Sequence, residues 1–199
     1  MRRHAVLLAV FLAALVCSGI QPKDRLTWAL EVAPAVAGAV LLVRTYPRFR
    51  LTDLAYALVF LHALILLVGG HYTYAEVPFF NWLRDALGLH RNSYDRLGHL
   101  AQGFVPAILA REILLRRSLL KRGKWLFFLV ICVCLAISAC YELFEWAAAA
   151  ITGDAADAFL GSQGDAWDTQ KDMACALVGA ILSLLTLGQA HDRAMERLG

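Results

Sequence analysis

The chain of 199 residues is 60% hydrophobic, carries a formal net charge of +3 and has a mean hydropathy of +0.59. Soluble domains usually hold about 45–50% apolar residues. Because the excess here lies in long blocks, the composition excludes an ordinary soluble domain and indicates an integral membrane protein. Most Lys and Arg residues fall in predicted loops on one side, so the charge predicts no nucleic-acid partner.

Six apolar stretches predict membrane-spanning helices, since a span needs about 20 residues. They lie near residues 5–21, 26–43, 51–70, 97–115, 125–150 and 168–188. The first follows the basic sequence "MRR" and could instead be a signal peptide, but "LVCS" is a poor cleavage site, which favours a retained helix. No Ser-, Pro- or Gly-rich linker divides the chain, so residues 1–199 are expected to form one all-α bundle of six transmembrane helices.

The basic residues predict the orientation of this bundle. With the N-terminus in the cytoplasm, thirteen of the nineteen Lys and Arg residues fall in cytoplasmic segments and six fall on the other side. The positive-inside rule therefore predicts that both termini are cytoplasmic. Segments 71–94 and 151–167 are then expected outside the membrane, and segment 116–124 is expected inside.

A short helix is predicted in the outer segment "PFFNWLRDALGL", near residues 78–88. Pro78 suits the first turn of a helix. Phe79, Phe80, Leu83 and Leu87 recur at helical spacing and alternate with polar residues, which is typical of a helix lying in the membrane interface. The alternative is an ordinary extracytoplasmic connection with aromatic residues at the membrane surface.

Ionisable residues gather at the predicted outer ends of four segments, whereas Arg and Lys dominate the cytoplasmic ends. In "NSYDRLGHLAQGF", Asp95, His99 and Gln102 follow at i, i+4 and i+7 and would share one helical face. Glu142 and Glu145 are i, i+3 neighbours in the outer half of the fifth span. The sixth span opens with Asp168 and Asp172, joined by Asp165 if the helix begins that early, and "GGHYTY" ends the third span.

These residues predict a polar site at the outer face, because charged groups within a span are unfavourable and usually face a protein interior. The candidate catalytic residues are Asp95, His99, Glu142, Glu145, Asp168 and Asp172, and the candidate substrate-binding residues are His71, Tyr74, Arg96 and Gln102. Each of them alone also has a structural interpretation. His99 and Gln102 could join helices by hydrogen bonds, and Tyr74 could belong to an interfacial aromatic belt.

Two kinds of chemistry suit this set of residues. A divalent metal ion is one, because His with carboxylates can bind zinc and a mostly carboxylate site suits manganese or magnesium. The sequence contains no HExxH motif, and the E-x-x-E of residues 142–145 lacks the His of a di-iron pattern. The second kind is general acid–base catalysis by Glu142 or Asp168 with His99. The sequence contains no GxSxG nucleophile motif that would add a covalent step.

Four ordered motifs, "HYTYAEVPFFNW", "NSYDRLGHLAQGF", "YELFEW" and "GDAWDTQKDM", resemble an uncharacterised bacterial inner-membrane family typified by YjdF. The resemblance spans roughly residues 50–190. It implies a helical fold in the bacterial inner membrane and assigns no activity. The family therefore supports the predicted location and leaves the chemistry to the residues.

A looser likeness to VanZ-like proteins lies in "DRLGH", "YELFE" and "DTQKDMACALVGAILS", although the sequence departs from that pattern at Met173, where an Asn before the Gly is expected. This likeness implies a site made of Asp95, Arg96, His99, Glu142, Asp168 and Asp172. VanZ-like proteins are linked to glycopeptide resistance at the cell envelope, so the implied work is on an envelope lipid or cell-wall precursor, by analogy.

Two functions follow from these observations. The first is an envelope enzyme or lipid-binding protein that acts on a polar headgroup at the outer leaflet. The second is a proton- or cation-coupled transporter, or a membrane accessory subunit, with the carboxylates as a relay. The absence of a visible inverted repeat, and of ionisable groups in the inner half of the late spans, favours the first.

Overall fold

The computed structural model describes residues 2–152, 159 and 162–198, which form seven α-helices and no strand. The helices are α1 (Arg2–Ser18), α2 (Arg25–Thr45), α3 (Asp53–Tyr72), α4 (Pro78–Leu87), α5 (Tyr94–Arg117), α6 (Lys124–Thr152) and α8 (Asp168–Glu196). The predicted all-α class is confirmed. Much of the predicted outer loop 151–167, including residues 153–158 and 160–161, lies outside the described residues.

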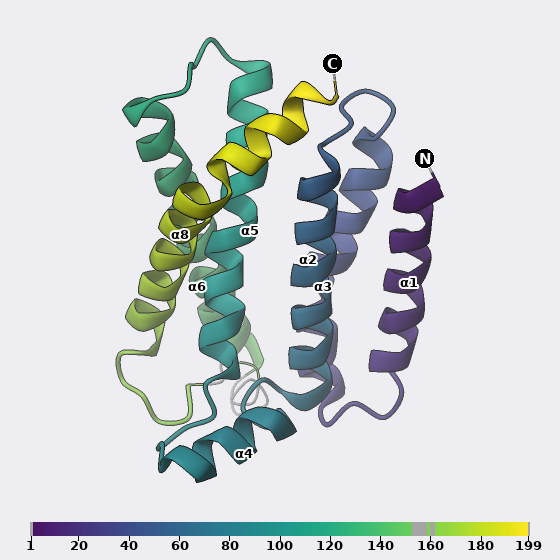
Figure 1. Cartoon of the computed structure of the whole chain (residues 1–199). Coiled ribbons are helices and arrows are strands. Elements are labelled where there is room, and N and C mark those ends of the chain that lie inside the picture. Colours follow the sequence, from purple (N-terminus) through teal and green to yellow (C-terminus); the bar gives the residue numbers. More distant parts are fainter. Residues whose placement is uncertain (1, 153–158, 160–161, 199) are drawn as a thin grey trace.

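The long helices run side by side in two groups (Figure 1). One group holds α1, α2 and α3, and the other holds α5, α6 and α8, with α3 packed against α5 where the two groups meet. The N- and C-terminal ends lie at the same end of the bundle, and α4 lies across the opposite end (Figure 1). The chain therefore has a terminal end and an α4 end.

Four helices are long and apolar enough to cross a membrane, namely α2, α3, α6 up to Ile151, and α8. The two other predicted spans do not meet these limits of length and hydropathy. Helix α1 has 17 residues, and α5 carries ionisable residues towards both of its ends. Twelve of the 24 residues of α5 are buried, so its polar groups are covered by protein rather than exposed to lipid.

Helix α5 lies unusually close to α8. A Cβ atom added to Gly103 would overlap the backbone of Ala176, and one added to Gly179 would overlap the carbonyl of Leu100. The small residues Ala107 and Ala180 are also fully buried nearby. Small side chains let two backbones approach, which gives extensive van der Waals contact between membrane helices. This approach brings together the polar ends of the two helices.

The helix bounds depart from the predicted spans where polar residues continue a helix beyond its apolar part. The predicted sixth span ends at residue 188, yet α8 continues to Glu196 and buries His191 completely.

At the other end of the bundle, Asp24 caps α2, its Oδ1 accepting a hydrogen bond from the Thr27 amide at 2.6 Å. That hydrogen bond lowers the pKa of the Asp24 carboxyl from its ordinary value.

The predicted helix at residues 78–88 is present as α4, with Pro78 in its first turn and Gly88 in a left-handed conformation (φ 63°) just after its end. Phe79, Trp82 and Leu87 are more than 60% exposed. These large apolar side chains, combined with Arg84 and Asp85 on the same short helix, give α4 the amphipathic character expected of an interfacial helix.

Candidate functional site

The site begins with the turn that starts α5. The side chain of Asn92 is fully buried, and its Oδ1 accepts a hydrogen bond from the Tyr94 amide at 3.0 Å. Its Nδ2 donates to the carbonyl of Val77 at 3.1 Å and to Asn81 Oδ1 at 2.8 Å. Gln163 exchanges two hydrogen bonds of 2.9 Å with the Asn92 backbone. Asn92 thus fixes the first turn of α5 against α4 and the segment before α8.

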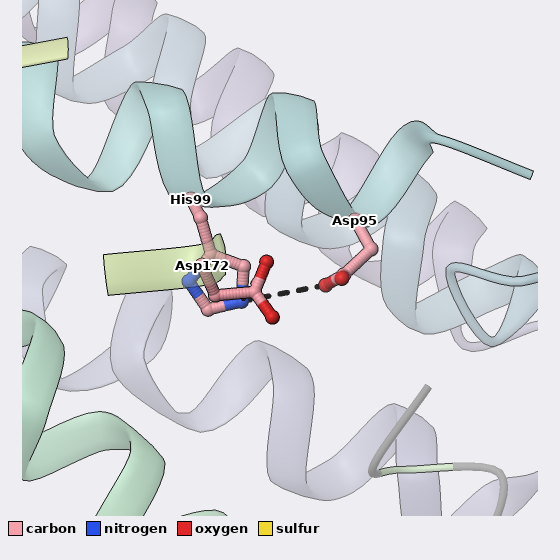
Figure 2. A group of neighbouring side chains, drawn as sticks. All are labelled: Asp95, His99 and Asp172. Atoms are coloured by element: carbon pink, nitrogen blue, oxygen red, sulfur yellow. Dashed lines mark ion pairs between the residues drawn. The ribbon is translucent and has the colours of Figure 1, made fainter. Parts of the chain in front are cut away.

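His99 lies at the centre of the predicted group, with a 6% exposed side chain (Figure 2). Its Nε2 lies 3.4 Å from Asp95 Oδ1 on the same helix and 3.8 Å from Asp172 Oδ1 on α8. Its Nδ1 lies 3.2 Å from Gln102 Oε1. The i, i+4 spacing of Asp95 and His99 places both on the face of α5 that meets α8, as the sequence predicts.

Glu142 brings a third helix, α6, to His99. Its Oε1 lies 3.7 Å from His99 Nδ1, is buried, and has no hydrogen-bond partner. Glu145, one turn further along α6, is half-buried, and no hydrogen bond or ion pair within the described residues joins it to His99. The structure therefore brings Glu142 into contact with the predicted group and leaves Glu145 at its margin.

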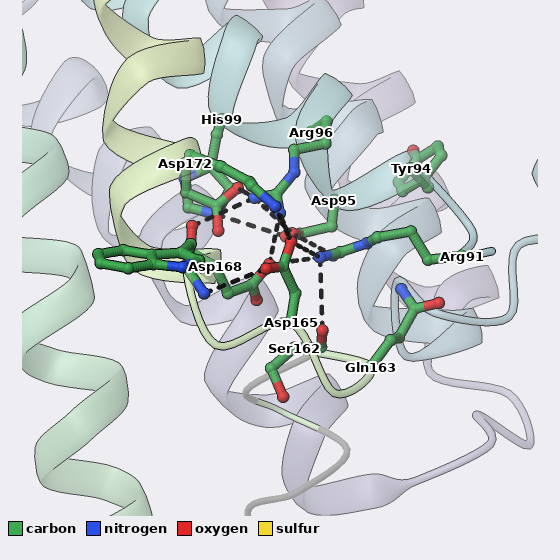
Figure 3. Close-up of polar contacts among 12 residues, drawn as sticks. Arg91, Tyr94, Asp95, Arg96, His99, Ser162, Gln163, Asp165, Asp168 and Asp172 are labelled. Atoms are coloured by element: carbon green, nitrogen blue, oxygen red, sulfur yellow. Dashed lines mark hydrogen bonds and ion pairs between the residues drawn. The ribbon is translucent and has the colours of Figure 1, made fainter. Parts of the chain in front are cut away.

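Two arginines, Arg91 and Arg96, lie among the carboxylates of this group (Figure 3). Arg96 Nη2 donates to Asp168 Oδ1 at 2.6 Å, and its Nη1 contacts Asp172. Arg91 contacts Asp168 as well, and its Nη2 lies 3.2 Å from Asp95 Oδ2. The two guanidinium groups thus bridge α5 and α8 through carboxylates that the sequence analysis had predicted.

Arg91 is a member of the site that the sequence analysis missed. It precedes α5 and so lies outside the predicted span, although its i, i+4 spacing to Asp95 was a usable signal. Its Nη1 also donates to the carbonyl of Ser162 at 3.4 Å. Arg91 therefore connects the carboxylates of the bundle to the segment that leads into α8.

Asp165 lies in a turn before α8, because the helix begins only at Asp168. The conditional prediction that Asp165, Asp168 and Asp172 share one helical face therefore fails for Asp165. Its Oδ2 nevertheless lies 3.3 Å from Arg96 Nη2 and accepts a hydrogen bond from Lys171 Nζ at 2.6 Å. The bond from Lys171 is the main cause that lowers the pKa of the Asp165 carboxyl.

A buried carboxylate on α2 lies close to the same end of the bundle. Glu31 is 4% exposed, and its Oε2 accepts a hydrogen bond from the Tyr141 hydroxyl at 3.1 Å. The ring of Tyr141 lies 6.4 Å from that of His99 between centroids. Sequence reasoning did not assign Glu31 to the site, although a single carboxylate inside an otherwise apolar run is itself a signal.

The predicted substrate-binding residues have different positions. Gln102 and Arg96 belong to the His99 group, as described above. His71 contacts the carbonyl of Ser18 through its Nδ1 at 2.8 Å and therefore joins α3 to the end of α1. Tyr74 is buried, with its ring 5.5 Å from that of Tyr94. His71 therefore lies at the junction of α1 and α3, and Tyr74 lies beside Tyr94, and neither contacts the His99 ring in the described residues.

A second buried polar cluster lies at the terminal end of the bundle, where the sequence analysis expected Arg and Lys to dominate and the inner half of the late spans to lack ionisable groups. Glu112 and His191 are fully buried, and His191 Nε2 lies 3.0 Å from Glu112 Oε2. Thr52 donates to Glu112 Oε2 through its hydroxyl at 2.8 Å, and Arg111 Nη1 lies 2.9 Å from His191 Nδ1. The expectation was wrong because α8 extends beyond its apolar part and α5 carries two ionisable residues inward.

The two clusters differ in how well their polar groups are satisfied. Glu112 accepts hydrogen bonds from the Thr52 amide and hydroxyl and from Arg116, besides its contact with His191. In the His99 group, Glu142 Oε1 lacks a hydrogen-bond partner. Suitable ligand atoms of Asp95, His99 and Asp172 lie within 4.8 Å of one another. A saturated network is typical of structure, whereas unsatisfied buried groups are typical of a binding or catalytic site.

The all-helical fold, its four candidate spans and its buried ionisable groups define an integral membrane protein. Residues 3–193 match the family described as predicted membrane protein DUF2238, and the chain belongs to this family. It is 53% identical over 185 residues to the inner membrane protein YjdF of Escherichia coli (strain K12), covering 93% of this chain and 88% of that protein. The predicted family resemblance is thereby confirmed, and the chain is an inner-membrane protein.

No solved structure matches the chain significantly. These comparisons do not show the looser likeness to VanZ-like proteins, so it gives the site no support. The assignment of site residues therefore depends on the geometry of this chain.

Proposed function

We propose that this protein binds and processes the polar headgroup of an envelope lipid or a cell-wall precursor at the outer face of the inner membrane. The observation that carries the proposal is the position of His99. Its ring is buried among carboxylates from α5, α6 and α8, directly beside two arginines. Acid–base groups beside a pair of guanidinium groups suit an anionic substrate with an ionisable reacting centre.

The two arginines are the groups that would bind an anionic headgroup. Arg91 and Arg96 each present a planar donor set that matches phosphate as well as carboxylate. Their present partners are Asp95, Asp165, Asp168 and Asp172. A phosphate group would exchange with some of these carboxylates. Glu142, whose Oε1 lies 3.7 Å from His99 Nδ1, would accept and donate protons at the bound headgroup.

The proposed topology has six spans, with α1 and α5 crossing the membrane alongside the four apolar helices. Both termini are cytoplasmic, and α4 lies in the outer interface beside the His99 group. The arrangement rests on the bias of basic residues and on the shared end of the two termini (Figure 1). It makes the His99 group open to the outer leaflet.

This topology predicts opposite labelling of two positions. Single cysteines at Ser162 and Arg117, introduced into a cysteine-free chain, should react with membrane-impermeant maleimide from the periplasmic and the cytoplasmic side, respectively. Intact spheroplasts should therefore label the Ser162→Cys protein, and the Arg117→Cys protein should label only after lysis. The reverse pattern would overturn the orientation and place the His99 group at the inner leaflet.

The proposed function predicts that an anionic envelope lipid copurifies with the wild-type protein and is detected by native mass spectrometry. Arg91→Gln combined with Arg96→Gln should reduce the lipid-bound fraction at least tenfold, because both phosphate-binding groups are lost. Glu142→Gln should retain the lipid in at least the wild-type amount, since proton transfer is lost while the arginines remain.

The matched control is Lys23→Gln, which removes an exposed cation that pairs with Glu76 at the same end of the bundle. It should bind lipid as the wild type does. Equal lipid content in the double arginine variant and the control, with both proteins folded by circular dichroism, would contradict the proposal. So would the absence of any lipid enriched over the bulk membrane composition.

A second candidate function is proton- or cation-coupled transport. The buried Glu112–His191 pair at the terminal end favours it, because ionisable groups then occur at both ends of α5 and α8. Against it, the fully buried side chains between the two clusters are mostly apolar or small, including Val130, Cys134 and Ala180. Such a layer interrupts a polar path, so the headgroup-processing function is supported better.

A further inference from the structure

We infer that Asp95, His99 and Asp172 bind a divalent transition-metal ion such as Mn²⁺ or Zn²⁺. The inference deepens the proposed function and rests on it for the location of the site, since it names the cofactor of the same group of residues. The metal binding itself is measured without any lipid substrate.

The hydrogen-bonding roles of the two nitrogens of the His99 ring favour a metal ion beside Nε2. Nδ1 lies 3.2 Å from Gln102 Oε1, an amide oxygen that can only accept, so a neutral His99 ring with this contact carries its proton on Nδ1. Nε2 then presents its lone pair to carboxylate oxygens of Asp95 and Asp172 (Figure 2). In this tautomer the three acceptor atoms face one another, and a metal ion between them would bind all three, while Arg96 and Arg91 also contact the carboxylates of Asp172 and Asp95.

The distances between His99 Nε2 and the two carboxylate oxygens also favour a metal ion. Nε2 lies 3.4 Å from Asp95 Oδ1 and 3.8 Å from Asp172 Oδ1. These separations exceed the roughly 2.7–3.2 Å of an ordinary N–H···O hydrogen bond. A tetrahedral ion with bonds of about 2.0–2.2 Å holds its ligand atoms roughly 3.4 Å apart. The two printed separations are close to the spacing of ligands around one ion, and all three ligand atoms lie within 4.8 Å of one another.

Glu142, which lies outside the triad of Asp95, His99 and Asp172, supports the same site independently. Glu142 Oε1 is buried, has no hydrogen-bond partner and lies 3.7 Å from the His99 ring. The side chain of Glu142 is only 7% exposed. A buried carboxylate oxygen without a donor is unfavourable, and a water ligand of the ion would supply the missing donor. Glu142 is then placed to orient that water.

The residues around the triad fit the outer partners of a metal site. Gln102 fixes the tautomer and orientation of His99, and Arg96 holds Asp172 through its guanidinium group. Outer partners of this kind orient the ligands of protein metal sites. One imidazole and two carboxylates suit Mn²⁺ or Zn²⁺ better than Ca²⁺, which prefers six to eight oxygen ligands.

The test measures metal binding by the full chain in detergent. Wild-type protein treated with chelator and then dialysed should bind one Mn²⁺ per chain, measured by the loss of the free-ion electron paramagnetic resonance signal. Zn²⁺ should displace the bound Mn²⁺. His99→Gln and Asp172→Asn should each weaken Mn²⁺ binding at least tenfold. The matched control His90→Gln removes an exposed histidine between α4 and α5, at the same end of the bundle, and should bind Mn²⁺ as the wild type does.

A second measurement covers variants that fail to fold. Mn²⁺ should raise the apparent melting temperature of the wild-type protein, and Mg²⁺ at the same concentration should not. The inference is overturned if the wild type binds no Mn²⁺ or Zn²⁺, which would leave His99 as a protonated ring paired with Asp95. It is equally overturned if folded His99→Gln protein keeps wild-type affinity. Metal binding without copurified lipid would support the metal site and reject the proposed function. Copurified lipid without metal binding would support the proposed function and reject the metal site.

Discussion

Gly103→Ala is expected to destabilise the protein by about 3 kcal/mol, at the upper end of the usual effect of overpacking. The added Cβ would overlap the backbone of Ala176, and a backbone cannot rotate away as a side chain can. Helices α5 and α8 would have to separate. Because α5 carries His99 and α8 carries Asp172, the separation should also abolish metal and lipid binding.

Gly188→Ala is the matched control for this prediction. Gly188 also lies in α8, but a Cβ added there would have no other atom within 4 Å. Alanine should therefore be neutral or stabilise the helix by up to about 1 kcal/mol. Apparent melting temperatures in detergent, together with the monodisperse yield, compare the two variants. A Gly103→Ala protein as stable as the Gly188→Ala protein would contradict the close approach of α5 and α8.

Glu112→Ala is expected to destabilise the protein by about 3–5 kcal/mol, the range found when one member of a buried ion pair is removed. The change would leave His191, the Thr52 amide and the Arg116 guanidinium group without their shared acceptor at the terminal end of the bundle. This network is saturated with hydrogen bonds, so its loss should act on stability directly.

The same measurements test the role of the Glu112 network. The control Glu76→Ala removes an exposed carboxylate that pairs with Lys23, and such surface pairs contribute about 0–1 kcal/mol. If the Glu112→Ala and Glu76→Ala proteins have the same apparent melting temperature, the Glu112 network is dispensable for folding. It would also strengthen the transport candidate, because a buried polar pair that does not stabilise the fold needs another reason to be there.

The apolar runs of the sequence predict most of the fold, because a helix in lipid must satisfy its own backbone and bury its apolar side chains. Hydropathy was a weaker guide to the helix bounds. It ended the last predicted span at residue 188, where the helical periodicity continues through polar residues to Glu196. Arg111 lies near the end of the predicted span 97–115, where hydropathy gives no sign that the structure buries it, with 7% of the residue exposed.

The contacts within one helix of the site could be predicted from the sequence, whereas the ion pairs between helices could not. The i, i+4 relation of Asp95 and His99 follows from helix geometry alone. Arg96 adjoins Asp95 in sequence, yet its closest contacts are with Asp168 and Asp172 on α8. That choice depends on the rotation of α5 against α8, which Gly103 sets through a contact 73 residues away at Ala176.

The low hydropathy of α5 has a consequence for how the protein is made. A segment with ionisable groups at both ends enters lipid poorly by itself. The partners that neutralise those groups lie largely on α8, which is synthesised after α5. The order of synthesis therefore differs from the order of assembly. The ionisable ends of α5 are therefore expected to gain their ion-pair partners only after α8 has been synthesised.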